Sequence, residues 1–513
     1  MSWSAKAALA TAHWAWPPFR IGRLSEAALA VKASPPAPVL GRAKVQGLVA
    51  GPRQGLAARD DAALTGGSSL LHLRSRQFLN SAAPDCVLAL MKTARRHTSV
   101  PALAILALST ATFARTTPQR PQDLALVGGL VHADPAQEPI PDGVVLVRGG
   151  TITAVGRRGT VPIPSGVEVV DCTGRTIAAG LWNNHVHFME RKWANAGQIP
   201  AAELAGQIEG MLTRFGFTSV FDTGSSWENT RRIRDRIEAG ELPGPRIRST
   251  GEIMVPKGGL PPDLVFDITG MMHQRIPEVA DAGDALASAQ AHLDAGTDGI
   301  KIYAATWAPP IVAIPEDAIR AAADETHRRG KLVFAHPSNR EGLMNAVRGG
   351  ADVIVHTAPN SGTWDETVLG PMRKAGVALI PTLKLWRHEL QHDRDTARDA
   401  FVGAGVAQLR AWLAAGGVVL FGTDVGYMGE YDPSDEYALM AEAGMTPRQI
   451  LASLTTAPCE KFGESARRGR VAVGMAADLV VFDSNPLRDV RAFAAVRYTI
   501  RDGKIIARRK REE

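Results

Sequence analysis

Cysteine is scarce in this chain of 513 residues, which has only Cys86, Cys172 and Cys459. Three cysteines are too few for a disulfide framework, and the absence of a CxxC pair excludes a zinc module built on cysteines. One disulfide, between Cys172 and Cys459, remains possible, because the sequence does not show whether these two residues lie close together.

The chain also lacks an apolar run long enough for a stable membrane span, which takes about 20 residues. The apolar run 100–113 has 14 residues. It follows a basic segment that begins at Met91, and the small residue Ala114 ends it. This is the layout of a signal peptide at 91–114, and it predicts a protein exported to the periplasm or secreted.

Residues 1–90 lack tyrosine and any sustained helical or alternating pattern. Because a signal peptide acts from the start of a chain, we expect Met91 to be the initiator. Residues 1–90 are then expected to be untranslated or disordered, and a leader of another use is the alternative.

An excess of charge is missing from most of the chain. Residues 1–114 hold 13 Lys and Arg against 4 Asp and Glu, whereas the rest holds 45 against 48. The overall charge of +6 therefore comes from the front segment. A slightly acidic body carries no electrostatic footprint for nucleic acid, and we expect a small-molecule substrate instead. The sequence does not determine the oligomeric state, and a homo-oligomer is possible.

What the chain does have is a change of pattern along its length. Short β-rich runs separated by glycine turns fill 123–177 and return after 477. Between them, apolar strands alternate with helical stretches, which indicates βα units and a parallel sheet. The eight candidate strands are 181–188, 217–223, 245–250, 298–304, 331–336, 352–357, 377–382 and 418–424.

Eight such units predict an α/β fold of the TIM type, a (β/α)8 barrel, over residues 179–466. The flanking β segments, 115–178 and 467–513, are each too small to fold alone. We expect them to pair into one small composite β-sandwich.

Polar residues with metal-binding chemistry stand at the ends of several of these strands. Since the carboxyl ends of barrel strands meet at one mouth, we expect these side chains to converge. Together they form a ligand set for one or two divalent metals and predict hydrolysis by a metal-activated water. The predicted ligands are His185, His187, Lys301, His336, His356 and Asp424.

Lys301 is the unusual member, because a protonated ammonium cannot bind a metal. It lies in the otherwise apolar strand 299–303, where burial would lower its pKa and leave a neutral, nucleophilic amine. Such an amine can add CO2 to form a carbamate, whose two oxygens can bridge two metals. The alternative is a lysine that reaches solvent or pairs with an acid.

With this ordered set, the chain from about residue 123 resembles the amidohydrolase superfamily, in particular its imidazolonepropionase-like and dipeptidase-like branch with two metals. The run 474–481 is similar to that family's return into the β-sandwich. The resemblance implies two divalent metal ions, zinc by default, that share a hydroxide and the carbamate on Lys301. It also implies that Asp424 is catalytic, accepting a proton and passing it to the leaving amine.

Two departures from the family pattern bear on the support of the metal ligands and on the type of reaction expected. Asn183 stands where the family has an aspartate before the H-x-H pair, so one carboxylate acceptor for the histidines is missing. Deaminases of the superfamily carry a glutamate three residues after the histidine of strand 5, whereas here Asn339 follows His336 at that spacing. An amide cannot shuttle protons, which disfavours deamination.

The resemblance therefore predicts hydrolysis of an amide or peptide-like C–N bond. Hydrolysis of a lactone or another ester on the same metal site is the first alternative, and a non-catalytic scaffold with this barrel is the second. Four residues near the predicted mouth are candidates for binding the substrate: Tyr303, His273, Lys384 and Arg387.

Overall fold

The computed structural model describes residues 123–259, 276–306 and 310–509. The chain divides into two units, Met1–Arg115 and Thr116–Glu513, and all described residues belong to the second. The predicted signal peptide at 91–114 and the candidate residue His273 lie outside the described residues.

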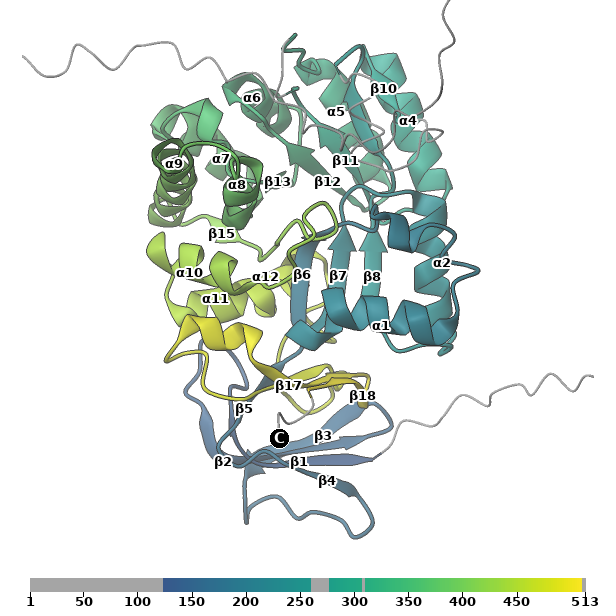
Figure 1. Ribbon diagram of the computed structural model, residues 1–513, viewed down its shortest axis with the longest axis vertical. Coiled ribbons are helices and arrows are strands. Elements are labelled where there is room, and N and C mark those ends of the chain that lie inside the picture. Colours follow the sequence, from purple (N-terminus) through teal and green to yellow (C-terminus); the bar gives the residue numbers. More distant parts are fainter. Residues whose placement is uncertain (1–122, 260–275, 307–309, 510–513) are drawn as a thin grey trace, which may run out of the picture. The chain divides into compact units, whose positions relative to one another are not determined.

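The centre of this unit is a parallel barrel, which confirms the predicted fold class (Figure 1). Each of the eight predicted segments contains a strand. They are β6 (Leu181–Val186), β7 (Phe217–Asp222), β8 (Arg246–Ser249), β11 (Gly299–Tyr303), β12 (Leu332–His336), β13 (Val353–Val355), β14 (Ala378–Ile380) and β15 (Val418–Val419). The strands are almost entirely buried, as expected for a parallel sheet covered on both faces.

Backbone hydrogen bonds close the barrel at its two seams. Asn184 N donates to Phe421 O at 2.8 Å and His187 N donates to Val425 O at 2.8 Å, so the chain beyond β15 lies beside β6. At the other seam, Asp298 N donates to Ser249 O at 2.7 Å. The additional strand β9 (Ile253–Pro256) pairs with β11, and β10 (Glu278–Val279) pairs with β9. These two strands were not predicted.

Helices cover the outside of the barrel. They are α1 (Ala201–Met211), α2 (Trp227–Glu238), α4 (Ala282–Asp294), α5 (Glu316–Arg328), α6 (Arg340–Arg348), α7 (Glu366–Ala375), α8 (Leu383–Glu389), α9 (Asp395–Ala414), α10 (Ser434–Glu442), α11 (Pro447–Leu454) and α12 (Thr456–Lys461). Short 3-10 turns lie at Arg191–Trp193, Thr213–Phe215, Pro359–Ser361 and Val490–Ala494.

Helix α5 illustrates why these segments are helical. Pro315 precedes it, and Glu316 and Asp317 place negative charge at its first turn, where the helix dipole favours it. Its buried residues recur at helical spacing and face the barrel. Gly330, in the left-handed region at a φ of 67°, follows the end of the helix.

The two flanking β segments form one continuous sheet in the order β18-β17-β16-β5-β1-β2-β3, with β4 paired to β1. Strand β16 pairs antiparallel with β5, so the chain before the barrel and the chain after it are joined directly. The strands are β1 (Leu124–Val131), β2 (Ile140–Arg148), β3 (Thr151–Arg157), β4 (Glu168–Asp171), β5 (Thr176–Ala179), β16 (Leu479–Phe482), β17 (Val496–Arg501) and β18 (Lys504–Arg508).

This sheet packs around its own apolar core. Val145 and Ile152, from β2 and β3, share one cluster of buried residues with Leu479 and Ile500, from β16 and β17. The sheet contacts the barrel where the barrel strands begin. Arg246, the first residue of β8, lies 2.8 Å from Asp478 and 2.7 Å from Asp502. The strand ends that carry the predicted ligands therefore face away from the sheet.

The described cysteines do not form the bridge that the sequence left open. Cys172 and Cys459 are both free and buried. Cys172 belongs to the core of the sheet, whereas Cys459 packs among aromatic residues of the barrel, including Trp182 and Phe462.

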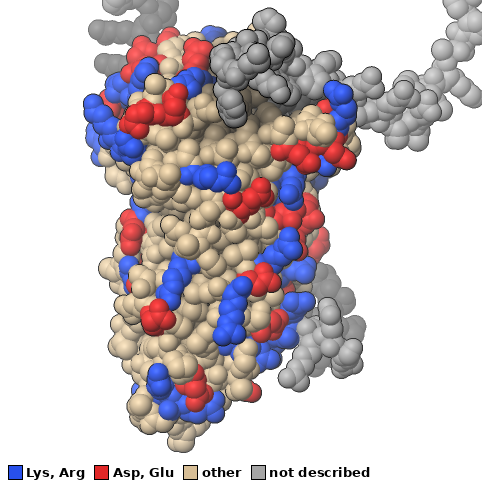
Figure 2. All heavy atoms as spheres, turned by 90° about the vertical axis from the view of Figure 1, so that its left-hand side faces the viewer, with Lys and Arg blue, Asp and Glu red and all other residues tan. Residues whose placement is uncertain are grey.

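Among the described ranges, no helix is long and apolar enough to cross a bilayer. On the face shown in Figure 2, basic and acidic side chains are interspersed rather than gathered into a patch of one sign.

Candidate metal centre

The six predicted ligands all lie at or near the carboxyl ends of barrel strands. His185 and His187 are in and just after β6, Lys301 is in β11, and His336 is the last residue of β12. His356 follows β13 with a φ of 74°, and Asp424 has a φ of 64°. Such left-handed backbone is uncommon outside glycine and often marks functional sites.

Three of these side chains meet at one point. Asp424 Oδ1 lies 3.0 Å from His185 Nε2 and 2.9 Å from His187 Nε2. The two Nε2 atoms are 3.1 Å apart. All three side chains are buried, and their ligand atoms satisfy the spacing of a metal site. Two ligand atoms in a tetrahedral zinc site, each about 2.0–2.1 Å from the ion, are about 3.3 Å apart, close to these separations.

The hydrogen bonds of the ring Nδ1 atoms orient three of the histidines. His187 Nδ1 is 3.0 Å from the carbonyl oxygen of Gly224. His185 Nδ1 is 2.8 Å from Thr223 Oγ1, and His356 Nδ1 is 2.6 Å from Thr382 Oγ1. Each ring thus has a protein partner at Nδ1, as metal-binding histidines usually do, although Thr223 Oγ1 also lies 3.4 Å from His185 Nε2.

His187 makes the strongest argument for a bound cation. A carbonyl oxygen only accepts hydrogen bonds, so His187 Nδ1 carries the hydrogen and donates it to Gly224 O. In the neutral ring, Nε2 then presents a lone pair to Asp424 Oδ1 and to His185 Nε2. Acceptor atoms so close together repel one another unless a proton or a metal ion lies between them.

The charge states of this cluster suit a metal. Burial lowers the pKa of His185 to about 3, which keeps the ring neutral. Burial alone would raise the pKa of Asp424, but the neighbouring His185 and His187 hold it well below its ordinary value. Neutral imidazoles beside an ionised carboxylate are the forms that bind metal ions.

The remaining ligands extend the site to one side. The ring centroid of His356 is 4.8 Å from that of His185 and 4.5 Å from that of His336. Burial lowers the pKa of His336 and of His356 well below the ordinary value, so both rings are neutral. The histidines therefore form a continuous row across the mouth. Together with Asp424 and Lys301, they are numerous enough to bind a second ion.

Lys301 is buried, with 2% of its surface exposed. Its Nζ makes no hydrogen bond or ion pair with any of the described residues. Burial lowers the pKa of Lys301 to about 7, against the smaller opposing effects of Asp424 and Asp222. A neutral amine is therefore abundant at physiological pH, which is the state that adds CO2.

Asn183, which replaces the aspartate of the family pattern, does not contact a histidine ring. Its amide donates to Thr423 Oγ1 at 2.7 Å, and its oxygen accepts from the backbone N of His185 at 3.3 Å. It thereby ties the first strand to the last one. Asp222 is enclosed by hydroxyl donors, from Ser225 at 2.6 Å and Ser249 at 2.9 Å, and serves the packing of the strands.

The candidate substrate-binding residues have different surroundings. Tyr303 stacks on His336 with ring centroids 3.9 Å apart, at the edge of the metal centre. Lys384 is buried and donates to Asp432 O at 2.6 Å and to Glu430 O at 3.2 Å, so its amine is engaged by the protein. Arg387 is exposed and pairs with Asp435 at 3.2 Å.

Sequence reasoning missed the partners of the histidine rings, Thr223, Gly224 and Thr382. Thr223 and Thr382 are the last residues of the predicted strand segments 217–223 and 377–382, and a hydroxyl at such a position was the only available signal. It also missed two residues of the mouth, Glu389 and Tyr427.

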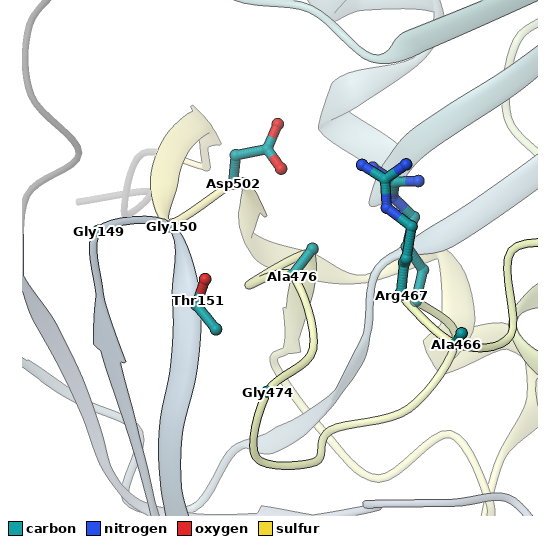
Figure 3. Close-up of a pocket in the computed structure, with 9 residues that line it drawn as sticks. Gly149, Gly150, Thr151, Ala466, Arg467, Gly474, Ala476 and Asp502 are labelled. Atoms are coloured by element: carbon teal, nitrogen blue, oxygen red, sulfur yellow. The ribbon is translucent and has the colours of Figure 1, made fainter.

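A separate surface pocket of about 410 Å³ lies on the sheet side of the molecule (Figure 3). It is lined by the turns at Gly150 and Asp502 and by Arg467 and Arg468. None of the predicted ligands lines it. Asp502 pairs with Arg246, and Arg468 pairs with Asp478 at 3.1 Å. These charged residues of the pocket lining are therefore already neutralised by partners within the protein. We place the candidate site at the barrel mouth instead.

Comparison with known proteins agrees with this fold. The model of the amidohydrolase family matches residues 176–506. The ochratoxinase of Aspergillus niger is 23% identical over 420 residues, which cover 72% of this chain and 83% of that protein.

Two solved structures are similar over most of their length. A putative prolidase from Bifidobacterium longum is 26% identical, with a TM-score of 0.64, covering 77% of this chain and 97% of its own. A prolidase in complex with N-methylphosphonate-L-proline is also 26% identical, with a TM-score of 0.62, covering 76% and 100%. The chain therefore belongs to the amidohydrolase family, and the prediction of a hydrolase that acts on carbon–nitrogen bonds is confirmed.

Proposed function

We propose that this protein is a metal-dependent hydrolase of an amide or peptide-like bond, with its active site at the barrel mouth. The observation that carries the proposal is the convergence of His187 Nε2, His185 Nε2 and Asp424 Oδ1, whose spacing suits a metal ion between them. Two divalent metals, zinc by default, would be held by these residues together with His336, His356 and a carbamate on Lys301.

A divalent metal bound there supplies Lewis-acid activation of water and of the substrate carbonyl. The protein's own residues prepare the site for this. Thr223, Gly224 and Thr382 fix the ring orientations through Nδ1. Asp424 takes the proton of the attacking water on a carboxylate oxygen and passes it to the leaving nitrogen, as a general base and then a general acid.

Metal analysis of the purified protein tests the site directly. We expect between one and two equivalents of divalent metal per chain, and Lys301→Ala should lose part of it. Less than one equivalent in the wild type, after dialysis against zinc and bicarbonate, would contradict the proposal.

A substitution at Asp424 tests metal binding and catalysis separately. Asp424→Asn keeps an oxygen that can bind a metal but cannot carry the proton. We expect it to retain most of the metal and to lose at least about 100-fold in kcat, the usual contribution of general acid–base catalysis. An unchanged kcat would exclude the proposed role of this carboxylate.

The activities in the names of the similar proteins suggest which substrates to assay first. A panel of Xaa-Pro dipeptides, N-acyl amino acids and lactones, offered to the metal-loaded protein, compares amide with ester hydrolysis. Amide turnover above lactone turnover supports the proposal, and the reverse order favours the ester alternative. A fully metal-loaded protein that hydrolyses none of them would favour a scaffold.

We also propose export to the periplasm or out of the cell. The support is the basic, apolar and small-residue order of 91–114. Expression of the full gene in a Gram-negative host, followed by fractionation and mass determination of the mature N-terminus, tests it. Cleavage after Ala111 or Ala114 is expected, and uncleaved protein confined to the cytoplasm would contradict it.

A further inference from the structure

Glu389 and Tyr427 lie at the same mouth as the metal centre. Glu389 is the last residue of α8, which begins directly after Thr382, the partner of His356. Tyr427 lies three residues after Asp424, in a tight loop in which Met428 N donates to Asp424 O at 3.2 Å. The Tyr427 hydroxyl donates to Glu389 Oε1 at 2.7 Å. This contact joins the segments that follow two different barrel strands, α8 after β14 and the loop after β15.

The surroundings of Glu389 combine partial burial with nearby negative charge. Burial raises the pKa of Glu389, the bond from Tyr427 lowers it, and Asp424 is near enough to raise it further. The neighbouring His388, whose ring centroid lies 6.1 Å from that of Tyr427, has its pKa lowered by burial and adds no positive charge.

Three cations of the described ranges have partners other than Glu389. Lys192 lies 2.8 Å from Glu190, Lys384 donates to the carbonyls of Glu430 and Asp432, and Arg387 pairs with Asp435. Within the described ranges, no lysine, arginine or histidine pairs with Glu389. Its Oε2 likewise has no donor there. A half-buried carboxylate is costly without a positive partner, so a cationic ligand would stabilise it.

We propose that Glu389, held in place by Tyr427, is a subsite that binds a positively charged group of the substrate, an ammonium or a guanidinium. The inference rests on the proposed function, since the scissile amide is taken to lie at the metal centre of the same mouth. The cation can be a side chain of the substrate or its free amino terminus, and the experiment below distinguishes these sources.

The turnover test uses substrates that differ only in charge. Dipeptides that carry lysine are compared with those that carry norleucine, and arginine is compared with citrulline, each with a free and an acetylated amino terminus. We expect the wild type to prefer the cationic member by about 10- to 100-fold in kcat/KM, mainly through KM, because the charge is bound in both ground and transition state.

The variant Glu389→Gln keeps an acceptor for Tyr427 and removes the charge. It should lose that preference while turnover of the neutral members changes by less than about threefold. Tyr427→Phe should lose a smaller part of it. Asp399→Asn, which removes a charge from an exposed position of α9, is the matched control and should behave as the wild type. Sensitivity to acetylation alone would assign the subsite to the amino terminus, and sensitivity to the side chain alone to a side-chain cation.

A binding measurement keeps the proposal separate from the proposed function. Calorimetry of the metal-loaded protein with L-lysine and L-arginine, against L-norleucine and L-citrulline, needs no turnover. Tighter binding of the cationic pair that Glu389→Gln abolishes supports the subsite even if no amide is hydrolysed. Hydrolysis of neutral and cationic amides at equal rates, equally affected by Glu389→Gln, would overturn the subsite and leave the proposed function intact.

Discussion

At the scale of single residues, Lys301 shows a conflict between chemistry and location. A lysine amine prefers water and a proton, yet this one is buried without a hydrogen-bond partner among the described residues. Burial lowers its pKa from the ordinary 10.5 to about 7. The folded protein without metal or carbamate therefore carries a cost that binding of CO2 and metal would relieve.

The effect of burying Lys301 on the free energy of unfolding depends on pH in a predictable direction. Between about pH 7 and 10.5 the unfolded chain keeps the Lys301 proton and the folded protein has lost it. Since the unfolded state then binds more protons, this group makes the free energy of unfolding rise with pH across that window. In metal-free, CO2-free buffer, we expect Lys301→Met to be more stable than the wild type at pH 7. The difference should shrink as pH approaches 10.

Chemical denaturation of both proteins with a chelator present, at several pH values, measures this difference. The comparison between the two proteins cancels other titrating groups. A difference that does not change with pH would show that Lys301 keeps its proton in the folded state.

Thr382 predicts a second effect at this scale. Its hydroxyl is the partner of His356 Nδ1 at 2.6 Å. Thr382→Val keeps the shape and removes that bond, so we expect metal affinity to fall about 10- to 100-fold. Thr382→Ser restores the hydroxyl and should recover most of it. Competition with a chromophoric chelator gives the affinities, and equal values for Val and Ser would mean that the hydroxyl does not orient the ring.

At the scale of an element, the segment 420–428, which follows the last barrel strand, is tightly packed on its neighbours. Gly426 has a φ of 96°, and a Cβ there would lie 1.8 Å from the carbonyl oxygen of His187. A Cβ at Gly422 would lie 2.8 Å from His185 Cβ. The segment thus packs its backbone directly on the two ligands of the first strand.

Gly426→Ala should therefore displace His187 or the loop that carries Asp424. We expect a lower melting temperature, by several degrees, and loss of most bound metal. Gly429→Ala is the matched control, because a Cβ at Gly429 meets no atom within 4 Å. Thermal unfolding and metal content measure both effects, and similar behaviour of the two variants would contradict the close approach described here.

The same segment marks the limit of what the sequence could predict. All eight barrel strands fall within predicted segments, because apolar runs between helical stretches are a strong signal. The last prediction, 418–424, is longer than the observed β15, which ends at Val419. Beyond it, Phe421 N donates to Ser453 O of α11 and not to a neighbouring strand. Strands β9 and β10 were missed because their pairing depends on neighbours far along the chain rather than on local pattern.

For the site, residues at strand ends could be predicted and their surroundings could not. His336 and His356 are recognisable because each closes an apolar run. The contact of Tyr427 with Glu389 and that of Thr223 with His185 join residues distant in sequence, and no spacing encodes them.

At the scale of the whole molecule, the chain around the barrel is held by one sheet built from both flanks. Since β1, the first strand of this sheet, starts at Leu124, we expect a variant that begins at Arg115 to fold and to keep full metal content and activity. Soluble yield, circular dichroism and the hydrolysis assay test it. Insoluble protein would show that residues before 115 support the body of the molecule.

The opposite truncation should fail. A variant that stops after Gly474 lacks β16, which lies between β5 and β17 in the sheet. It would leave β5 paired only with β1 and expose the apolar face that Leu479 and Val481 cover. We expect aggregation, seen by size-exclusion chromatography, whereas a stable monomer would mean that the barrel does not need the sheet.

The pairing of Ala179 with Leu479 has a consequence for synthesis of the protein. A ribosome adds about 5–20 residues per second, so roughly 15–60 s pass between the emergence of these two partners. During that interval β5 offers an unpaired edge, which is a template for aggregation. Any chaperone that protects this edge would have to act on the nascent chain, before the last strands are made.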